Sequence, residues 1–157
     1  MRILFVCMGN ICRSPTAEGV MRALLRDEGL DGRVEIDSAG TGNWHAGDPP
    51  DARAVSAARA RDIVLEGAAR QVTAADFEHF DLLLAMDREN ERELLARAPD
   101  AAARAKVRLL REFDPAAVAA GDLDVPDPYY SGARGFEHVL DLVQAACRGL
   151  LDEVRAA

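Results

Sequence analysis

The feature that most constrains the fold lies at the start of the chain, where an apolar run meets a short polar turn and then a helix. Residues 3–6 (ILFV) are apolar without alternation, which is typical of a strand buried on both faces. Pro15 follows the turn at residues 7–14, and proline is favoured in a first helical turn. Apolar residues then recur at helical spacing over residues 17–25, up to Gly29. The pattern predicts strand, tight loop and helix.

The same alternation continues along the chain. Patterning predicts further strands at 33–38, 81–86 and 106–110, further helices at 51–61, 73–79, 88–97 and 132–155, and mostly loop at 115–128. Strands alternating with helices indicate a mostly parallel sheet covered on both faces, which is an α/β fold. No repeat, linker or composition shift divides the sequence, so residues 1–157 are predicted to form a single domain.

Charge and cysteine content exclude several classes of protein. The formal net charge of −8 argues against a nucleic-acid partner, because duplex binding depends on a basic surface. No apolar stretch is long enough to span a membrane, and the first strand is too short for a signal peptide. Three cysteines, an odd number, do not form a secreted disulfide framework, so a cytoplasmic location is expected. The oligomeric state is left open.

The polar turn carries the chemistry. Five residues separate Cys7 from Arg13, and the turn lies where parallel sheets bind ligands, at the carboxyl end of a strand. Backbone N–H groups in such a turn converge on an anion, and the positive potential of the helix start favours a thiolate at Cys7. Arg13 offers a planar fork for two phosphate oxygens. Gly9 and Asn10 tolerate the positive φ angles of a tight cradle, and a hydroxyl at residue 14 is able to donate to the Cys7 sulfur.

Residues 6–18 (VCMGNICRSPTAE) resemble the signature of the low-molecular-weight protein tyrosine phosphatases. Further segments follow in family order: 37–41 (DSAGT), 69–72 (ARQV), 85–87 (AMD) with Asn90, and 127–130 (DPYY). The resemblance covers essentially the whole chain. It implies a four-stranded parallel sheet with a phosphate-binding loop after the first strand. It also implies hydrolysis of phosphotyrosine in proteins or peptides, without a cofactor or metal.

The resemblance also implies roles for individual residues. Cys7 is the nucleophile that forms a phosphocysteine, Arg13 is the phosphate clamp, and Asp127 is the general acid and base. Substrate and phosphate contacts are expected from the loop residues Met8, Gly9, Asn10, Ile11, Cys12 and Ser14, and from the pocket wall formed by Trp44, Tyr129 and Tyr130. Ser38 and Asn10 resemble the residues that support the cradle.

The sequence departs from the family pattern at one supporting position. Many members have a histidine two residues before the Ala-Arg-Gln unit, where it supports the cradle asparagine, but this chain has Gly67. The support of Asn10 is therefore expected to come from another part of the chain, or the loop to be less rigid. Asp87 with Asn90 is interpreted as a helix cap rather than a functional pair.

The remaining cysteines and histidines complete the set of candidates. Cys12 fits two hypotheses equally, a redox partner of Cys7 or a small filler under the loop. Cys147 lies on an apolar helical stripe and is predicted to be core. The three histidines are scattered without ligand spacing, so no metal site is predicted.

Three other functions would require features that this sequence lacks or would leave some of its residues unused. An arsenate reductase shares this fold and a similar loop but passes a disulfide through extra cysteines near mid-chain, and none lies between Cys12 and Cys147. A non-catalytic phosphate-binding module would need neither a nucleophile nor an acid. Dinucleotide binding would require a glycine-rich fingerprint after the first strand, which is absent. If Asp127 were not the acid, Asp122 or Asp124 on the same segment would be the candidates.

Overall fold

The computed structural model describes all 157 residues and is built on one parallel sheet. The strand order is β2-β1-β3-β4, and every neighbouring pair is parallel. The strands are β1 (Arg2–Cys7), β2 (Glu35–Gly40), β3 (Leu82–Ala85) and β4 (Val107–Leu109). The predicted single-domain α/β fold with a four-stranded parallel sheet is therefore confirmed.

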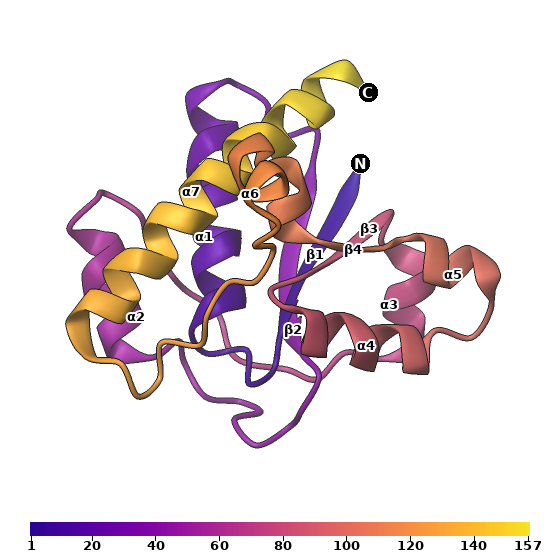
Figure 1. Cartoon of the computed structure of the whole chain (residues 1–157), viewed down its shortest axis with the longest axis horizontal. Coiled ribbons are helices and arrows are strands. Elements are labelled where there is room, and N and C mark those ends of the chain that lie inside the picture. The colour runs from indigo at the N-terminus through magenta and orange to yellow at the C-terminus, as the bar shows by residue number, and fades with distance from the viewer.

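Helices cover both faces of the sheet (Figure 1). On one face lie α1 (Arg13–Asp27), α2 (Ala52–Arg59) and α7 (Gly132–Ala156). On the other lie α3 (Ala74–His79), α4 (Arg88–Arg97) and α5 (Ala101–Ala105). The 3₁₀ turn η1 (Leu110–Phe113) and α6 (Pro115–Ala120) follow β4 and lead into the segment before α7. No helix combines the length and apolarity needed to cross a membrane.

Strand β1 runs through the middle of the core. Its residues Ile3 and Phe5 belong to the larger apolar cluster, against α1 and α7, whereas Leu4 and Val6 belong to the smaller cluster on the other face. All four side chains are fully buried, as expected for side chains that alternate between two covered faces. This rigid strand ends at Cys7 and fixes the start of the loop that follows.

The segment after β4 differs from the prediction. Residues 115–128 were expected to be mostly loop, but Pro115–Ala120 forms helix α6. Asp114 caps this helix by accepting a hydrogen bond from Ala116 N, Pro115 occupies its first turn, and Gly121 closes it with a φ of 69°. Asp, Pro and Gly in these places form a complete set of start and stop signals around a short alanine-rich run. The strand expected at 106–110 also ends one residue early, because Leu110 begins η1.

Candidate active site

The polar turn lies at the carboxyl end of β1, and helix α1 begins directly behind it at Arg13. No side chain caps this helix, so its first N–H groups are available to an anion in the turn. A cavity of about 210 Å³ opens in front of the turn. Its lining comprises Cys7, Met8, Gly9, Ile11, Cys12, Arg13, His45, Asp127, Tyr129 and Tyr130. Residues that are more than a hundred positions apart in the sequence thus meet at one site.

Cys7 presents its sulfur at the floor of this cavity. The residue is only 3% exposed, and Asn10 N donates to Cys7 Sγ at 3.3 Å. Ser14 Oγ lies 3.0 Å from the same sulfur. Hydrogen bonds from a backbone N–H and a hydroxyl stabilise a thiolate more than a thiol.

Asn10 determines the shape of the turn. Its φ is 57°, so this residue, and not Gly9, takes the left-handed conformation that the sequence predicted for the cradle. Its Oδ1 accepts a hydrogen bond from Arg70 N at 3.0 Å. Because a backbone N–H is always a donor, this contact fixes which end of the amide is oxygen. The amide Nδ2 then donates to Ser14 Oγ at 2.8 Å and to Ser38 Oγ at 3.0 Å.

This arrangement shows what supports Asn10 when Gly67 replaces the family histidine. The support comes from the backbone of Arg70 and from Ser38, whose hydroxyl donates to Glu18 Oε1 at 2.7 Å. Arg22 Nε in turn donates to Glu18 Oε2 at 3.1 Å. Gly67 itself has a φ of 96° and open space around its missing Cβ. A continuous hydrogen-bonded chain therefore runs from Arg22 at the surface to the Cys7 sulfur.

Arg13 is buried beneath the cavity and oriented by acceptors. The residue is 4% exposed, and its Nη1 donates to Asp87 Oδ2 at 2.5 Å and to Val125 O at 3.0 Å. Asp127 Oδ2 lies 4.0 Å from Nη2. Burial alone would lower the pKa of Arg13, but the Cys7 thiolate and Asp87 raise it above its ordinary value. The guanidinium is therefore a permanent cation beside the sulfur.

Asp87 does more than the predicted capping. Its Oδ1 does cap α4, by accepting from Asn90 N at 2.8 Å, which confirms the capping interpretation. Its Oδ2 meanwhile holds Arg13. One carboxylate thus ties the start of α4 to Arg13, the predicted phosphate clamp, and the sequence pattern alone had indicated only the cap.

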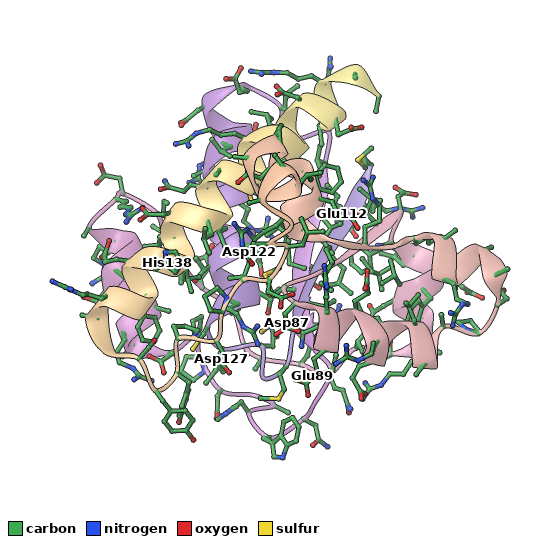
Figure 2. The ribbon with its side chains drawn as sticks, in the orientation of Figure 1. Asp87, Glu89, Glu112, Asp122, Asp127 and His138 are labelled. Atoms are coloured by element: carbon green, nitrogen blue, oxygen red, sulfur yellow. The ribbon has the colours of Figure 1, made fainter.

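Asp127 is the only acid of its segment in the cavity lining. Its Oδ1 accepts from Tyr129 N at 3.1 Å, and its side chain remains largely open to solvent. Asp122 instead pairs with Arg111 at 3.4 Å, and Asp124 Oδ1 accepts from Arg88 N at 3.0 Å. In Figure 2, Asp122 lies near the α6 end of the segment that joins α6 to α7, and Asp127 lies further along it. The geometry therefore favours Asp127 over the two alternative acids.

The cavity wall only partly matches the prediction. Tyr129 and the 95% exposed Tyr130 lie in the lining, whereas Trp44 is 70% exposed and lies outside it, with its ring close against Gly42. His45, which was not predicted, occupies the wall beside Gly9. Arg53 was also missed, although its Nη1 donates to Tyr129 O at 2.8 Å and its guanidinium lies 5.1 Å from the Tyr129 ring centre. His45 lies in an irregular loop without a pattern, and Arg53 lies in a predicted helix where nothing in the sequence marked it as part of the site.

The other two cysteines differ from Cys7 in their surroundings. Burial and the nearby Asp51, Cys7 and Asp127 charges raise the pKa of Cys12 to about 12, although Cys12 lines the same cavity. Burial raises the pKa of Cys147 to about 12 as well, and its side chain is fully enclosed in the larger core, as predicted. Both remain protonated thiols at neutral pH. No three His, Cys, Asp or Glu side chains are grouped as metal ligands would be.

The sequence and the fold are both similar to those of known proteins. The sequence profile of the family described as "Low molecular weight phosphotyrosine protein phosphatase" matches residues 2–157. A low molecular weight protein-tyrosine-phosphatase of Streptomyces coelicolor is 53% identical over 154 residues, which is 98% of this chain and 93% of that protein. A crystal structure of a protein tyrosine phosphatase from Entamoeba histolytica superposes with a TM-score of 0.93 and 37% identity, covering 99% of this chain and 97% of the other. A Drosophila arginine phosphatase superposes with a TM-score of 0.90 and 30% identity, covering 99% of this chain and 98% of the other.

Proposed function

The chain belongs to the low molecular weight phosphotyrosine protein phosphatase family, and on that premise we propose that it hydrolyses phosphotyrosine in proteins or peptides through a phosphocysteine. One observation carries the proposal: Cys7, Arg13 and Asp127 line a single cavity at the start of a helix. A nucleophile, a fixed cation and an exposed carboxyl group are the parts that phosphoryl transfer from a phenol requires. All of them come from the chain, so the reaction needs no cofactor.

In the first step the Cys7 sulfur attacks phosphorus and the phenolic oxygen leaves. The N–H groups of the turn and the Arg13 fork bind the equatorial phosphate oxygens, where charge is spread in the transition state. Asp127, entering protonated, donates its proton to the leaving oxygen. The Cys12 thiol does not compete as nucleophile, because its pKa of about 12 keeps it protonated.

In the second step water attacks the phosphocysteine and the sulfur leaves. Asp127, now ionised, takes the proton from the water. Ser14 Oγ accepts from Asn10 Nδ2, and its single hydrogen has two acceptors within reach, Ala39 O at 3.5 Å and the departing Cys7 sulfur at the shorter distance of 3.0 Å. The Asn10 network therefore prepares the hydroxyl for leaving-group stabilisation.

The surroundings of the cavity support an aromatic phosphate as substrate. Tyr129 and Tyr130 are packed edge to face at 4.9 Å between ring centres and stand on one side of the cavity. Such rings contact an aromatic ring favourably at this kind of distance. Phosphoproteins or phosphopeptides are the proposed partners. We propose no nucleic-acid or membrane partner and expect a cytoplasmic location.

Neither alternative function gains support from the site. A disulfide relay would require a further accessible thiol, but Cys147 is fully buried. A binding module would not require Asp127 in the lining, whereas this carboxyl lies beside the clamp.

The proposal is tested by phosphate release from matched peptides bearing phosphotyrosine, phosphoserine or phosphoarginine, in the presence of a chelator. We expect turnover of the phosphotyrosine peptide by the wild type and none by Cys7→Ser, which should still fold and bind inorganic phosphate. Equal turnover of phosphotyrosine and phosphoserine would contradict the specificity. Preference for the phosphoarginine peptide would assign the chain the substrate of its Drosophila relative, and activity in Cys7→Ser would remove Cys7 as nucleophile.

A further inference from the structure

The segment that carries Asp127 is a stiff arm that starts from a fixed base at residues 124–125 and is held at its far end where Arg53 Nη1 donates to Tyr129 O at 2.8 Å. Pro126 and Pro128 flank Asp127 on both sides. Each proline fixes its own φ and restricts the residue before it to extended conformations. Residues 125–128 therefore have few internal degrees of freedom, and the direction in which the arm leaves its base decides where the Asp127 carboxyl lies.

The base of this arm is the peptide unit between Asp124 and Val125. Val125 N donates to Met86 O at 2.7 Å, and the Val125 side chain is fully buried. On the other side of the same peptide, Asp124 O accepts from Arg111 Nη1 at 2.7 Å. Both polar groups of one peptide unit are thus bonded, in opposite directions, and this fixes the orientation of its plane.

Arg111 is an unusual residue to find in this place. It lies in η1, is only 6% exposed, and its Nε has no hydrogen-bond partner. Its one acidic neighbour, Asp122, is mostly solvent-exposed and 3.4 Å away. A guanidinium removed from water loses solvation that such sparse contacts restore poorly, and an apolar side chain of similar size would be less costly. An apolar side chain would not reproduce the hydrogen bond that Arg111 donates to the Asp124 carbonyl.

We propose that Arg111 is a positioning residue for proton transfer, because it holds the Asp124–Val125 peptide and thereby aims the proline-flanked arm that carries Asp127. Arg111 lies outside the cavity lining and makes no contact with the phosphate site. It acts through the backbone of the arm alone. The inference rests on the proposed role of Asp127 as general acid.

The test measures formation of the phosphocysteine in single turnovers, with phenyl phosphates whose leaving groups range from nitrophenol to phenol. A general acid is worth about 10²–10⁴-fold, and mainly for poor leaving groups. For Arg111→Met we expect a loss of about tenfold with phenyl phosphate, a part of that contribution, and of less than about twofold with nitrophenyl phosphate. Asp127→Asn should show the same steepening to a larger extent.

Two matched variants separate the backbone contact from charge. Arg111→Lys keeps a donor for the Asp124 carbonyl and should restore most of the rate with phenyl phosphate. Asp122→Asn removes only the exposed charge partner and should behave like the wild type. If Arg111→Met does not yield folded protein, Arg111→Gln tests the same contact with a shorter, uncharged side chain. Binding of inorganic phosphate, measured by inhibition, should be unchanged in every variant.

The outcomes distinguish this inference from the proposed function. A steep leaving-group dependence in Asp127→Asn but a wild-type dependence in Arg111→Met would leave the acid in place and overturn the role of Arg111. Wild-type dependences in both variants would remove Asp127 as acid and the inference with it. An equal rate loss for all leaving groups, or a loss in Asp122→Asn as large as in Arg111→Met, would show that Arg111 does not act by positioning the acid.

Discussion

Asn10 shows, at the scale of a single residue, how backbone conformation and hydrogen bonding are combined in the cradle. Asn10 has a φ of 57°, its N donates to the Cys7 sulfur, and its side chain bonds to Ser14, Ser38 and the backbone of Arg70. Asparagine is one of the few side chains that tolerates the left-handed region and also provides both a donor and an acceptor. Its two roles can be separated by substitution.

Asn10→Gly and Asn10→Ala both remove the side-chain network, but only alanine is strained at a positive φ. We expect both variants to lose stability and activity, with Asn10→Ala less stable than Asn10→Gly by about 1 kcal/mol. Urea unfolding of the two proteins measures the difference. Equal stabilities would mean that the turn changes its backbone conformation when the side-chain network is lost.

Cys12 lies in the same loop as Cys7, and its raised pKa should control how fast the two residues form a disulfide. Peroxide oxidises the Cys7 thiolate to a sulfenic acid, and a Cys12 thiolate then attacks that sulfur and expels hydroxide to form a disulfide. Because the pKa of Cys12 is raised to about 12, its thiolate fraction is small at pH 7 and grows about tenfold for each pH unit up to that value. We therefore expect the Cys7–Cys12 disulfide to form faster as the pH rises.

Peptide mapping of peroxide-treated protein at several pH values checks this expectation. Cys12→Ser is the matched control and should accumulate the irreversible sulfinic and sulfonic forms of Cys7 instead. If the wild type also gave only these higher oxides, at high pH as at neutral pH, Cys12 would be a packing residue under the loop.

At the scale of secondary structure, short helices hold the loops of the site through their first turns. Helix α4 is capped by Asp87, which also binds Arg13, and the first turn of α3 contains Asp76, whose Oδ2 accepts from Thr73 N at 2.7 Å. Both Asp76 oxygens also accept from Arg70, whose backbone N–H holds Asn10. The start of each helix is therefore connected to a residue of the cradle or clamp.

Asp76 should make folding stability depend on acid pH. Burial by itself would raise the pKa of Asp76, but the hydrogen bonds from Arg70 and Thr73 N lower it below its ordinary value. A carboxyl with a depressed folded-state pKa stabilises the protein fully above its unfolded pKa, near 4, and loses that effect as the pH falls through the folded value. We expect Asp76→Asn to lower the free energy of unfolding by about 1 to 2 kcal/mol at pH 7.

Urea unfolding of wild type and Asp76→Asn at pH 7 and below pH 4 measures this effect. The difference between the two proteins should shrink at the lower pH. Glu78→Gln, an exposed acid on the same helix, is the control and should change little at either pH. A difference that stayed constant with pH would show that the charge of Asp76 does not contribute.

At the scale of the whole molecule, α7 closes the fold over the larger core and against η1, the turn that holds Arg111 (Figure 1). The two elements approach closely at Gly149, where an added Cβ would lie 1.8 Å from Phe113 O. Only a residue without a side chain allows this contact. The packing of the last helix therefore bears on the segment that leads to Asp127.

Gly149→Ala tests this close approach. Replacing glycine by alanine within a helix normally stabilises it by about 0.5 to 1 kcal/mol, but here the Cβ would force α7 and η1 apart. We expect a net loss of about 1 to 3 kcal/mol in the free energy of unfolding, as in other overpacked cores. Gly32→Ala is the control, because a Cβ there meets nothing within 4 Å. A Gly149→Ala protein as stable as the wild type would show that α7 shifts at no cost.

Interactions between residues close in the sequence could be predicted from the sequence alone. The buried run at residues 3–6, the turn from Cys7 to Ser14 and the helix after it depend on local periodicity, on backbone N–H groups and on Pro15, and all three are confirmed. The capping hydrogen bond of Asp87 likewise joins residues that are only three positions apart in the sequence. The family signature covers these same local patterns, which is why the fold class was correctly predicted; the roles of the site residues stay predictions.

Only the tertiary structure decided which distant side chains meet around that turn. Three such contacts are the hydrogen bonds of Arg13 to Asp87, of Arg70 N to Asn10 and of Arg111 to Asp124 O. Each joins segments whose relative positions depend on how the helices pack on the sheet. The loop at residues 41–50 has no periodic pattern, so nothing in the sequence indicated that His45 would face the cavity and Trp44 would not. Local free energies fix the conformation of a strand, turn or helix, whereas the direction of an irregular segment is fixed only when the rest of the core is in place.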